Sequence, residues 1–434
     1  MTYEQALNYI HSRLRFGMKT GLDRIERLCE LLDNPQDKLK AIHVAGTNGK
    51  GSTCAMLARV LQTAGYKVGL FISPYITDFC ERMQIREQPI SHDQLAEITE
   101  QVKEAADKME KEGLYATEFE IVTAIAFKWF EQSKCQYVVI ETGLGGRLDS
   151  TNVIKNPLET IITSIDFDHT DILGDTIESI AMEKCGIIKQ NGITVVYPKQ
   201  NEKALDIILK TAAKKNNSVC IPSIDDCKIF SSDIHGTRFC YKDEIYNLAL
   251  AGEHQIYNAL TVIEAANALK KIGVDIGQND IEHAVLHVKF PCRFEVMSED
   301  PIIIIDGAHN PSAMHQLKNT LQKLLPDKNI HAVIGMLADT NYVQSMSIIA
   351  PLCKSIITVD INNPRALKKE ELCKYVSQYC VCSYENDYKD AVNKSIAKAK
   401  EDNGIVLICG SLYLASDIRP IISKNDKNEH NIIN

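Results

Sequence analysis

Short apolar runs alternate with segments of helical periodicity along most of the chain, a pattern that predicts parallel sheets with helices between the strands. In the N-terminal part, the runs expected to form buried strands are 40–44, 67–72, 137–140 and 160–165. Between the first two runs, residues 53–64 place apolar side chains at helical spacing and end at Gly65, as expected for a helix. This part of the chain therefore predicts an α/β domain.

The same alternation restarts after a polar break at 297–301, MSEDP. A second set of buried strands is expected at 302–305, 332–334, 356–359 and 406–409. Between the two sets, alternating hydrophobicity near 238–241 predicts an antiparallel ribbon at the edge of the first domain. Because 434 residues exceed what one hydrophobic core supports, we predict two domains, 1–297 and 298–434.

Composition and charge narrow the range of partners. A hydrophobic fraction of 45% with 24% charged residues is typical of a globular protein, and the net charge of -9 argues against binding nucleic acid or anionic membranes. No apolar run resembles a signal peptide or approaches the ~18 residues of a membrane span. The 14 cysteines are scattered, as in proteins of a reducing cytosol. We expect a cytoplasmic monomer with small-molecule substrates, no nucleic acid and no membrane.

The glycine-rich stretch HVAGTNGKGST, residues 43–53, lies between a predicted strand and a predicted helix. Its glycine spacing differs from that of the general P-loop. The setting nevertheless suits phosphate, because backbone N–H groups and the helix dipole point at whatever lies above such a turn. Lys50 would neutralise phosphate, and Ser52 or Thr53 could reach Mg²⁺. The alternative is a plain glycine-rich turn with an exposed lysine.

Acidic residues and histidines stand where several predicted strands end. Glu141 ends one strand of the first domain, and Asp306 and His309 follow the first strand of the second. Open α/β sheets bind ligands at this edge, and a carboxylate beside phosphates is a natural Mg²⁺ ligand. Carboxylates in two domains suggest a site shared across the cleft between them. A Glu141 side chain that only caps the next turn is equally compatible with this stretch.

Two further stretches have open interpretations. The strand at 160–165 runs into Asp166, Asp168, His169 and Asp171, where the histidine is as readily structural as a ligand. Glycines at 143, 145 and 146 would let the backbone approach a ligand closely. Lys184 lies on a predicted helix, where most lysines are solvated, and physical reasoning alone assigns it no role.

Taken in order, nine stretches resemble the folylpolyglutamate synthase and dihydrofolate synthase family, a branch of the Mur-type ATP-dependent amide ligases. The stretches are HVAGTNGKGST, ISPYITDFCERMQI, ATEFEIVTAIAF, IETGLGGRLDSTN, DHTDILGDTIESIAMEKCGIIK, AGEHQIYNAL, PCRFEV, IDGAHNP and CGSLYLASDIR. They extend from about residue 3 to about residue 420, and the spacing of the GTNGKGS loop is a mark of this family. The resemblance implies a P-loop-type doubly wound N-terminal domain with a small β-sheet and a Rossmann-like C-terminal α/β domain.

The resemblance also implies roles for individual residues. Those expected to bind ATP are Asn48, Gly49, Lys50, Gly51, Ser52, Asn258, Arg293 and Asp306. Those expected to bind Mg²⁺ are Ser52, Ser73, Glu141 and His169, joined by Lys184 if its amine is carbamylated into a carboxylate-like ligand. Phe119 and Asp149 lie in stretches expected to contact the pteridine of a folate. Lys50, Lys184 and His309 are the expected catalytic residues, with His309 in the region that handles glutamate and the transferred phosphate.

The implied reaction is the ADP-forming addition of L-glutamate to a folate through an acyl phosphate. Extension of the γ-glutamyl chain of tetrahydrofolate is expected, with or without addition of the first glutamate to 7,8-dihydropteroate. The alternatives are dihydrofolate synthase activity alone or another Mur-type amino-acid ligase. Mg²⁺ is the expected cofactor, with K⁺ or another monovalent cation as a further candidate. A nucleotide-dependent switch is a different class, which Asp306 and His309 argue against because a switch needs only the first domain.

Two positions depart from the family pattern. Cys80 stands where an asparagine usually precedes Glu81-Arg82, and Thr340 stands where a lysine is common. If that lysine binds nucleotide or phosphate, another cation must replace it, and Lys368 and Lys369 are the candidates.

Overall fold

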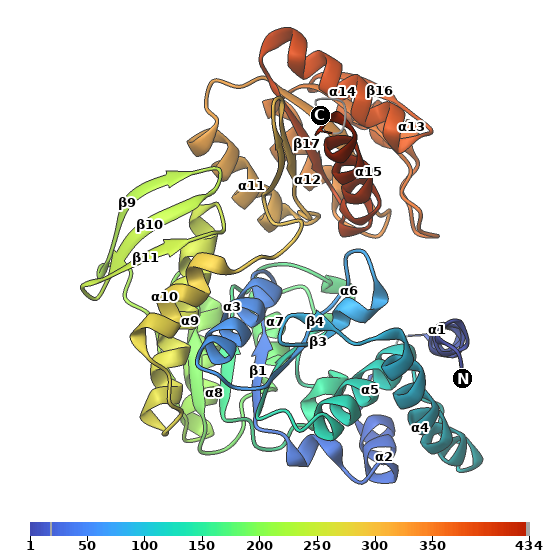
Figure 1. Ribbon diagram of the computed structural model, residues 1–434, viewed down its shortest axis with the longest axis vertical. Coiled ribbons are helices and arrows are strands. Elements are labelled where there is room, and N and C mark those ends of the chain that lie inside the picture. Colours follow the sequence, from blue (N-terminus) through green and yellow to red (C-terminus); the bar gives the residue numbers. More distant parts are fainter. Residues whose placement is uncertain (18–19, 431–434) are drawn as a thin grey trace. The chain divides into compact units, whose positions relative to one another are not determined.

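The computed structural model describes residues 1–17 and 20–430, with side chains described as far as residue 423 (Figure 1). The chain divides into two compact units. The first contains Met1–Lys228, Cys240–Tyr246 and Tyr257–Val288, and the second contains Ile229–Phe239, Asn247–Ile256 and Lys289–Asn434. The domain ranges 1–297 and 298–434 stay a prediction. Among the described residues, no helix combines the length and apolar composition needed to cross a membrane.

Within the described residues, the first unit is built on an eight-stranded sheet with the order β4-β3-β2-β5-β1-β6-β7-β8. Its strands are β1 Ala41–Ala45, β2 Val68–Phe71, β3 Met83–Ile85, β4 Gln88–Pro89, β5 Tyr137–Glu141, β6 Glu159–Ile162, β7 Ile193–Val196 and β8 Ser218–Cys220. The strands from β2 to β8 in this order run parallel, whereas β3 and β4 are antiparallel additions at one edge. From central β1 the chain forms β2, β3 and β4 on one side, returns to insert β5 beside β1, and then forms β6, β7 and β8 on the other side, which confirms the predicted doubly wound sheet. The expected strands are confirmed to within three residues at each end.

The helices of the first unit pack in groups around this sheet. They are α1 Tyr3–Ser12, α2 Asp23–Leu31, α3 Lys50–Thr63, α4 His92–Lys111, α5 Glu118–Gln132, α6 Thr170–Leu173, α7 Ile177–Cys185, α8 Glu202–Lys214 and α10 Gln278–His287, with short 3-10 helices η1 Arg13–Phe16, η2 Pro35–Lys38, η3 Phe79–Arg82 and η4 Ser150–Val153. Helices α1, α2, α4 and α5 share an apolar cluster with β2 and β5, and α7 and α8 share another with β6 and β7. Helix α3 packs against β1, β2 and β5 and contacts α10.

A small sheet follows, with β10 Gly236–Tyr241 between β9 Cys227–Asp233 and β11 Glu244–Leu248. Lys242 and Asp243, the two residues between β10 and β11, both have positive φ, as a tight hairpin turn requires. Phe239 and Tyr241 are buried while their neighbours are more exposed, so the ribbon predicted near 238–241 is confirmed. Helix α9 Glu253–Lys271 comes next, and the division between the units passes through this sheet and this helix.

The second unit has a sheet with the order β12-β13-β17-β14-β15-β16. Its strands are β12 Glu295–Glu299, β13 Ile302–Ile305, β14 Ile330–Ile334, β15 Cys353–Thr358, β16 Val381–Tyr384 and β17 Ile405–Cys409. All pair in parallel except β12, which is antiparallel to β13. The helices are α11 Pro311–Leu324, α12 Tyr342–Ile349, η5 Ala350–Leu352, α13 Lys369–Val376, α14 Tyr388–Asp402 and α15 Leu412–His430. The expected Rossmann-like α/β arrangement is confirmed.

Candidate active site

The glycine-rich loop lies between β1 and α3, as predicted. Strand β1 is buried at every position, and α3 begins at Lys50 directly after Gly49, whose φ of 85° is left-handed. Ser52 and Thr53 are buried on the first turn of the helix. The ammonium group of Lys50 donates to the carbonyl oxygen of Thr47 at 3.1 Å, so the lysine side chain folds back over the loop. Helix N–H groups with a lysine beside them form a site suited to an anion.

The segment after β6 holds this loop in place. The backbone N–H of Thr47 donates to the carbonyl of Ser164 at 2.7 Å, and the Thr47 hydroxyl donates to the carbonyl of Asp166 at 3.0 Å. A Cβ on Gly46 would lie 1.8 Å from Oγ1 of Thr163, so only glycine fits there. Sequence reasoning did not identify Thr47, Thr163 and Ser164, because these contacts join segments more than a hundred residues apart.

Asn258 on α9 contacts the same loop. A Cβ on Gly49 would lie 2.5 Å from Oδ1 of Asn258, so the amide side chain packs directly against this glycine. Gly49 is therefore required both by its left-handed φ and by this close approach. The structure thus brings Asn258 to residues 48–52, the segment with which it was expected to bind ATP.

Lys184 on α7 also reaches this loop. The residue is 4% exposed, and its ammonium nitrogen Nζ donates to the carbonyl oxygen of Gly46 at 2.7 Å. Burial and the nearby Lys50 ammonium lower the pKa of Lys184 to about 7, while Asp168 and Asp149 act in the opposite direction. The predicted helical lysine is therefore not solvated, and its amine has a substantial neutral fraction at physiological pH.

The expected Mg²⁺ ligands lie on separate segments. Glu141 ends β5, is 4% exposed, and accepts the backbone N–H of Ser73 through Oε2 at 3.1 Å. Ser73 stands at the end of neighbouring β2, so parallel pairing places these two residues together. His169 precedes α6, has a left-handed φ of 49°, and lies with Nε2 3.9 Å from Oδ1 of Asp168. Its side chain is 56% exposed.

The two residues expected to contact the pteridine have structural contacts of their own. The Phe119 ring lies 6.0 Å from the Phe71 ring and covers Gly143, where a Cβ would lie 2.5 Å from its Cζ. Asp149 is buried and accepts from the backbone N–H groups of Thr151 and Leu144. Burial raises the pKa of Asp149, and these hydrogen bonds act in the opposite direction.

The glycines after Glu141 serve the protein's own packing. A Cβ on Gly146 would lie 2.7 Å from the carbonyl oxygen of Lys184, so packing against α7 already requires this glycine, and the approach of a ligand to it stays a prediction. Nearby, a Cβ on Gly186 would lie 2.3 Å from Cα of Arg147, whose guanidinium pairs with Glu183 at 2.8 Å. These contacts press the loop after β5 against α7, the helix that positions Lys184.

In the second unit, three predicted residues surround Gly307. Asp306 follows β13 and accepts the backbone N–H groups of Phe294 at 2.8 Å and Ala308 at 2.7 Å. Burial raises the pKa of Asp306, and the Arg293 guanidinium lowers it in part. A Cβ on Gly307 would lie 2.5 Å from Nη1 of Arg293, and the carbonyl of Gly307 is 2.9 Å from Nδ1 of His309. The structure therefore brings Arg293, Asp306 and His309 together.

The structure shows which cations lie near Thr340, the position where a lysine is common in the family. The backbone of the loop containing Thr340 lies beside residues 365–366, since the N–H of Ala338 donates to the carbonyl of Arg365 at 2.8 Å. Arg365 pairs with Asp339 at 2.6 Å, whereas Lys369 is buried and pairs with Asp360 at 3.0 Å. Arg365 and Lys369 are thus both already paired with carboxylates, and sequence reasoning missed that Arg365 lies beside the Thr340 loop. Lys368, the other expected replacement, is exposed.

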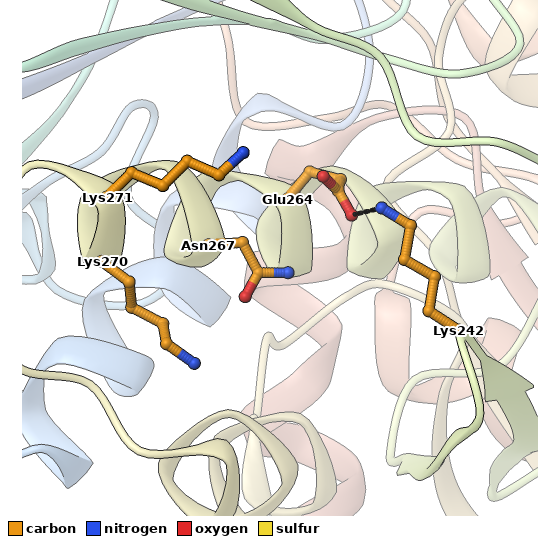
Figure 2. Close-up of a pocket in the computed structure, with 5 residues that line it drawn as sticks. All are labelled: Lys242, Glu264, Asn267, Lys270 and Lys271. Carbon is orange, nitrogen blue, oxygen red and sulfur yellow. Dashed lines mark hydrogen bonds and ion pairs between the residues drawn. The ribbon is translucent and has the colours of Figure 1, made fainter.

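A separate hollow of about 430 Å³ lies along the C-terminal half of α9. Figure 2 shows the side chains that line it. It is lined by Lys242, Glu264, Asn267, Lys270 and Lys271, none of which is a predicted site residue. Asn258 and Lys270 stand twelve positions apart on this helix, which corresponds to about 18 Å at 1.5 Å per residue. Lys242 and Glu264 neutralise each other at 2.7 Å. We therefore assign this hollow no role in the proposed nucleotide site.

Comparisons with known proteins identify the family of this chain. The model of the Mur ligase middle domain matches residues 44–266, and the model of the Mur ligase glutamate ligase domain matches residues 292–412. The chain is 39% identical over 430 residues to the dihydrofolate synthase/folylpolyglutamate synthase of Bacillus subtilis, covering 96% of this chain and 98% of the relative. It is 33% identical over 432 residues to the folylpolyglutamate synthase of Lacticaseibacillus casei, covering 96% and 98%.

A solved structure of Mycobacterium tuberculosis folylpolyglutamate synthase, complexed with ADP and AMPPCP, superposes with a TM-score of 0.88. The two sequences are 27% identical, and the match covers 97% of this chain and 99% of the other. A phosphate-loop unit followed by a glutamate ligase unit defines an ATP-dependent amide ligase of the Mur type. Within that class, the chain belongs to the folylpolyglutamate synthase/dihydrofolate synthase family.

Proposed function

We propose that this enzyme adds L-glutamate to folates at the expense of ATP and that it acts on both 7,8-dihydropteroate and tetrahydrofolate. The names of two relatives support this choice. The Bacillus subtilis relative is named for both activities, and the Lacticaseibacillus casei relative is named for folylpolyglutamate synthase alone. The observation that carries the proposal is the convergence of Lys50, Asn258 and Lys184 on one glycine-rich loop.

In the proposed first step, a carboxylate oxygen of the folate substrate attacks the γ-phosphorus of ATP. The new O–P bond forms as the bond to ADP breaks, which gives an acyl phosphate. The step joins two anions in a protein of net charge -9, so positive charge must be concentrated locally. Lys50 and the N-terminus of α3 supply it at the loop. We propose that Asn48, Gly49, Gly51 and Ser52 bind the phosphates there.

In the second step, the amino group of L-glutamate attacks the acyl carbon. The C–N bond forms, phosphate leaves, and the amine gives up a proton. We propose that Arg293 and Asp306 contact the nucleotide and that His309 acts where glutamate and the transferred phosphate meet. Their convergence around Gly307 supports a shared role. Phe119 and Asp149 are proposed to contact the pteridine.

The donor set supports a site for Mg²⁺. Glu141 is a buried carboxylate with Ser73 beside it, and oxygen ligands of this kind suit a hard divalent cation. Glu141, the hydroxyls of Ser73 and Ser52, and His169 would hold the ion, which supplies charge neutralisation to the phosphate oxygens when bound. A requirement for K⁺ stays a prediction. So do a monomeric state and a cytosolic location, the latter supported by 14 free cysteines.

Purified enzyme with ATP, Mg²⁺ and labelled glutamate tests the proposal. We expect label in the product with either dihydropteroate or tetrahydrofolate as acceptor, and ADP release that depends on the acceptor. Lys50→Ala should abolish both, whereas Lys210→Ala, at a lysine 72% exposed on α8, should change neither. Incorporation with one acceptor only would restrict the enzyme to that activity. Normal turnover by Lys50→Ala would refute the phosphate-loop assignment.

A further inference from the structure

Asp78, Cys80 and His92 form a cluster of potential metal ligands apart from the proposed active-site residues. One ligand atom from each, a carboxylate oxygen, the thiol sulfur and an imidazole nitrogen, lies within 4.8 Å of the other two. The residues come from two elements, because Asp78 caps the N-terminus of η3 and Cys80 is its second residue, whereas His92 is the first residue of α4. Cys80 is also where the sequence departs from the family pattern.

The local structure fixes these three side chains. Asp78 caps η3, with its Oδ1 accepting the backbone N–H of Cys80 at 2.7 Å and its Oδ2 lying 3.6 Å from Nε2 of His92. Tyr3 on α1 stacks on the His92 ring at 3.7 Å, and its hydroxyl lies 4.0 Å from Sγ of Cys80. Three segments distant in sequence therefore meet at this cluster.

We propose that Asp78, Cys80 and His92 bind one thiophilic divalent cation, with Zn²⁺ as the best match. Thiolate, imidazole and carboxylate are the three protein ligand types of zinc, and three ligands leave a fourth tetrahedral position for water. Magnesium binds thiolates poorly, so the Cys80 sulfur distinguishes this site from the proposed Mg²⁺ site, which has no sulfur ligand.

The distances are close to those of a formed site. Zinc bonds of about 2.0–2.3 Å put tetrahedral ligand atoms roughly 3.5 Å apart, so the cluster must contract by about 1 Å. Cys80 is 2% exposed and cannot move far, whereas the His92 side chain is 56% exposed and can turn towards the thiol. The buried sulfur of Cys80 would therefore bind the ion from the protein interior, and the imidazole of His92 would bind it from the solvent side.

Charge and protons balance on binding. Burial and the Asp78 carboxylate raise the pKa of Cys80 to about 12, so the thiol is protonated without a metal. When the cation binds, the S–H bond breaks, the sulfur–metal bond forms, and the proton goes to solvent. A dication with one thiolate, one carboxylate and a neutral imidazole has no net charge, which makes its half-buried position tolerable.

Titration of the metal-free full-length protein with Co²⁺, a spectroscopic substitute for Zn²⁺, tests this site without any substrate. We expect a thiolate-to-cobalt absorption band that saturates at one equivalent and disappears when Zn²⁺ is added, with release of one proton per Zn²⁺. Cys80→Asn should abolish the band, and His92→Gln should weaken binding by about tenfold or more. Cys135→Ser, at a half-buried thiol elsewhere in the same unit, should match the wild type.

Two results would overturn the proposal. One is the lack of a thiolate band in the wild type at one equivalent, which would leave the cluster as a hydrogen-bonded cap of η3. The other is an unchanged band in both Cys80→Asn and His92→Gln, which would assign the binding to other thiols. His92 is exposed, so its variant tests the site even if Cys80→Asn folds poorly. Neither result bears on ligase activity, so failure here is separable from failure of the proposed function.

Discussion

Lys184 is a buried amine that donates to the glycine-rich loop, and this setting has a chemical consequence. Carbamylation requires a neutral amine, whose nitrogen attacks the carbon of CO₂ and then loses a proton. A solvated lysine with a pKa of about 10.4 is almost wholly protonated at neutral pH. With its pKa lowered to about 7, Lys184 is available for this reaction, and the product is the carboxylate-like group that the family resemblance implies.

The first residue-scale prediction concerns this modification. Lys184→Ala should lose glutamate incorporation, and short carboxylic acids such as acetate should restore part of it by occupying the vacated space. Activity is measured with labelled glutamate over a series of acid concentrations, with Lys210→Ala as the exposed control. A mass of the Mg²⁺-bound wild type that corresponds to unmodified lysine would count against carbamylation.

The second residue-scale prediction concerns Glu159, at the start of β6. The side chain is 0% exposed, neither carboxyl oxygen has a hydrogen-bond partner within the described residues, and burial raises its pKa well above the ordinary value. Glu159→Met should raise the free energy of unfolding by about 1–3 kcal/mol at neutral pH, because it removes an unsatisfied buried polar group without shortening the side chain. Glu244→Met, at an exposed position of β11, should change it by less than about 0.5 kcal/mol. Equal effects, measured by denaturant unfolding, would refute the argument.

At the scale of elements, both ends of α3 use a glycine with left-handed φ, but for different reasons. Gly49 at the N-terminus has a φ of 85° and is packed against Asn258. Gly65 beyond the C-terminus has a φ of 91°, and a Cβ at this position would have no neighbour within 4 Å. Backbone strain is common to both positions. Only the first is tied to the proposed nucleotide contacts.

This pair gives a matched prediction. Gly49→Ala and Gly65→Ala should each destabilise the fold by roughly 1–2 kcal/mol, since an L residue is strained at both positions. Only Gly49→Ala should also lower kcat/KM for ATP, by about tenfold or more, because its Cβ displaces Asn258 and the loop. Unfolding curves and steady-state kinetics of both variants provide the comparison. An equal loss of kcat/KM would show that strain in α3, rather than the Asn258 contact, is responsible.

At the scale of the whole molecule, each compact unit contains an imidazole that stays neutral, fully buried in the case of His43 and partly buried in the case of His254. Burial lowers the pKa of His43 in the first unit to about 3 and that of His254 in the second to about 4. Nε2 of His43 lies 2.8 Å from the Thr151 hydroxyl. The unfolded chain binds a proton at each histidine below pH ~6.5, whereas the folded chain does not until far lower pH.

Stability should therefore fall as the pH drops from about 6.5 towards about 4, by up to about 1.4 kcal/mol per pH unit for each histidine. His43→Gln and His254→Gln should each flatten this dependence in denaturant unfolding measured from about pH 7 to about pH 5. Asp149 and Asp306, whose pKa values are raised by burial, oppose the trend, so each variant is compared with the wild type. Unchanged slopes in both variants would mean that other groups govern acid stability.

Much of the architecture follows from local pattern. Strands β1 and β13 are buried on both faces. Such burial appears in the sequence as a nearly continuous apolar run, which is why both strands could be predicted. The glycine-rich loop and the strand-end residues Glu141 and Asp306 are found in the same way, because their position relative to a strand is a matter of neighbouring residues. Their roles in binding stay predictions.

The sequence by itself determined the main buried strands of both sheets and, through the family resemblance, the doubly wound and Rossmann-like character of these sheets and the family. Only the tertiary structure decided that Asn258 packs on Gly49, that Lys184 donates to Gly46, and that Asp78, Cys80 and His92 meet. The physical reason is that periodicity reports which face of an element is buried. Periodicity does not report which side chains from distant parts of the sequence meet in the interior, because that depends on how the elements pack. The same packing sets the pKa of Lys184.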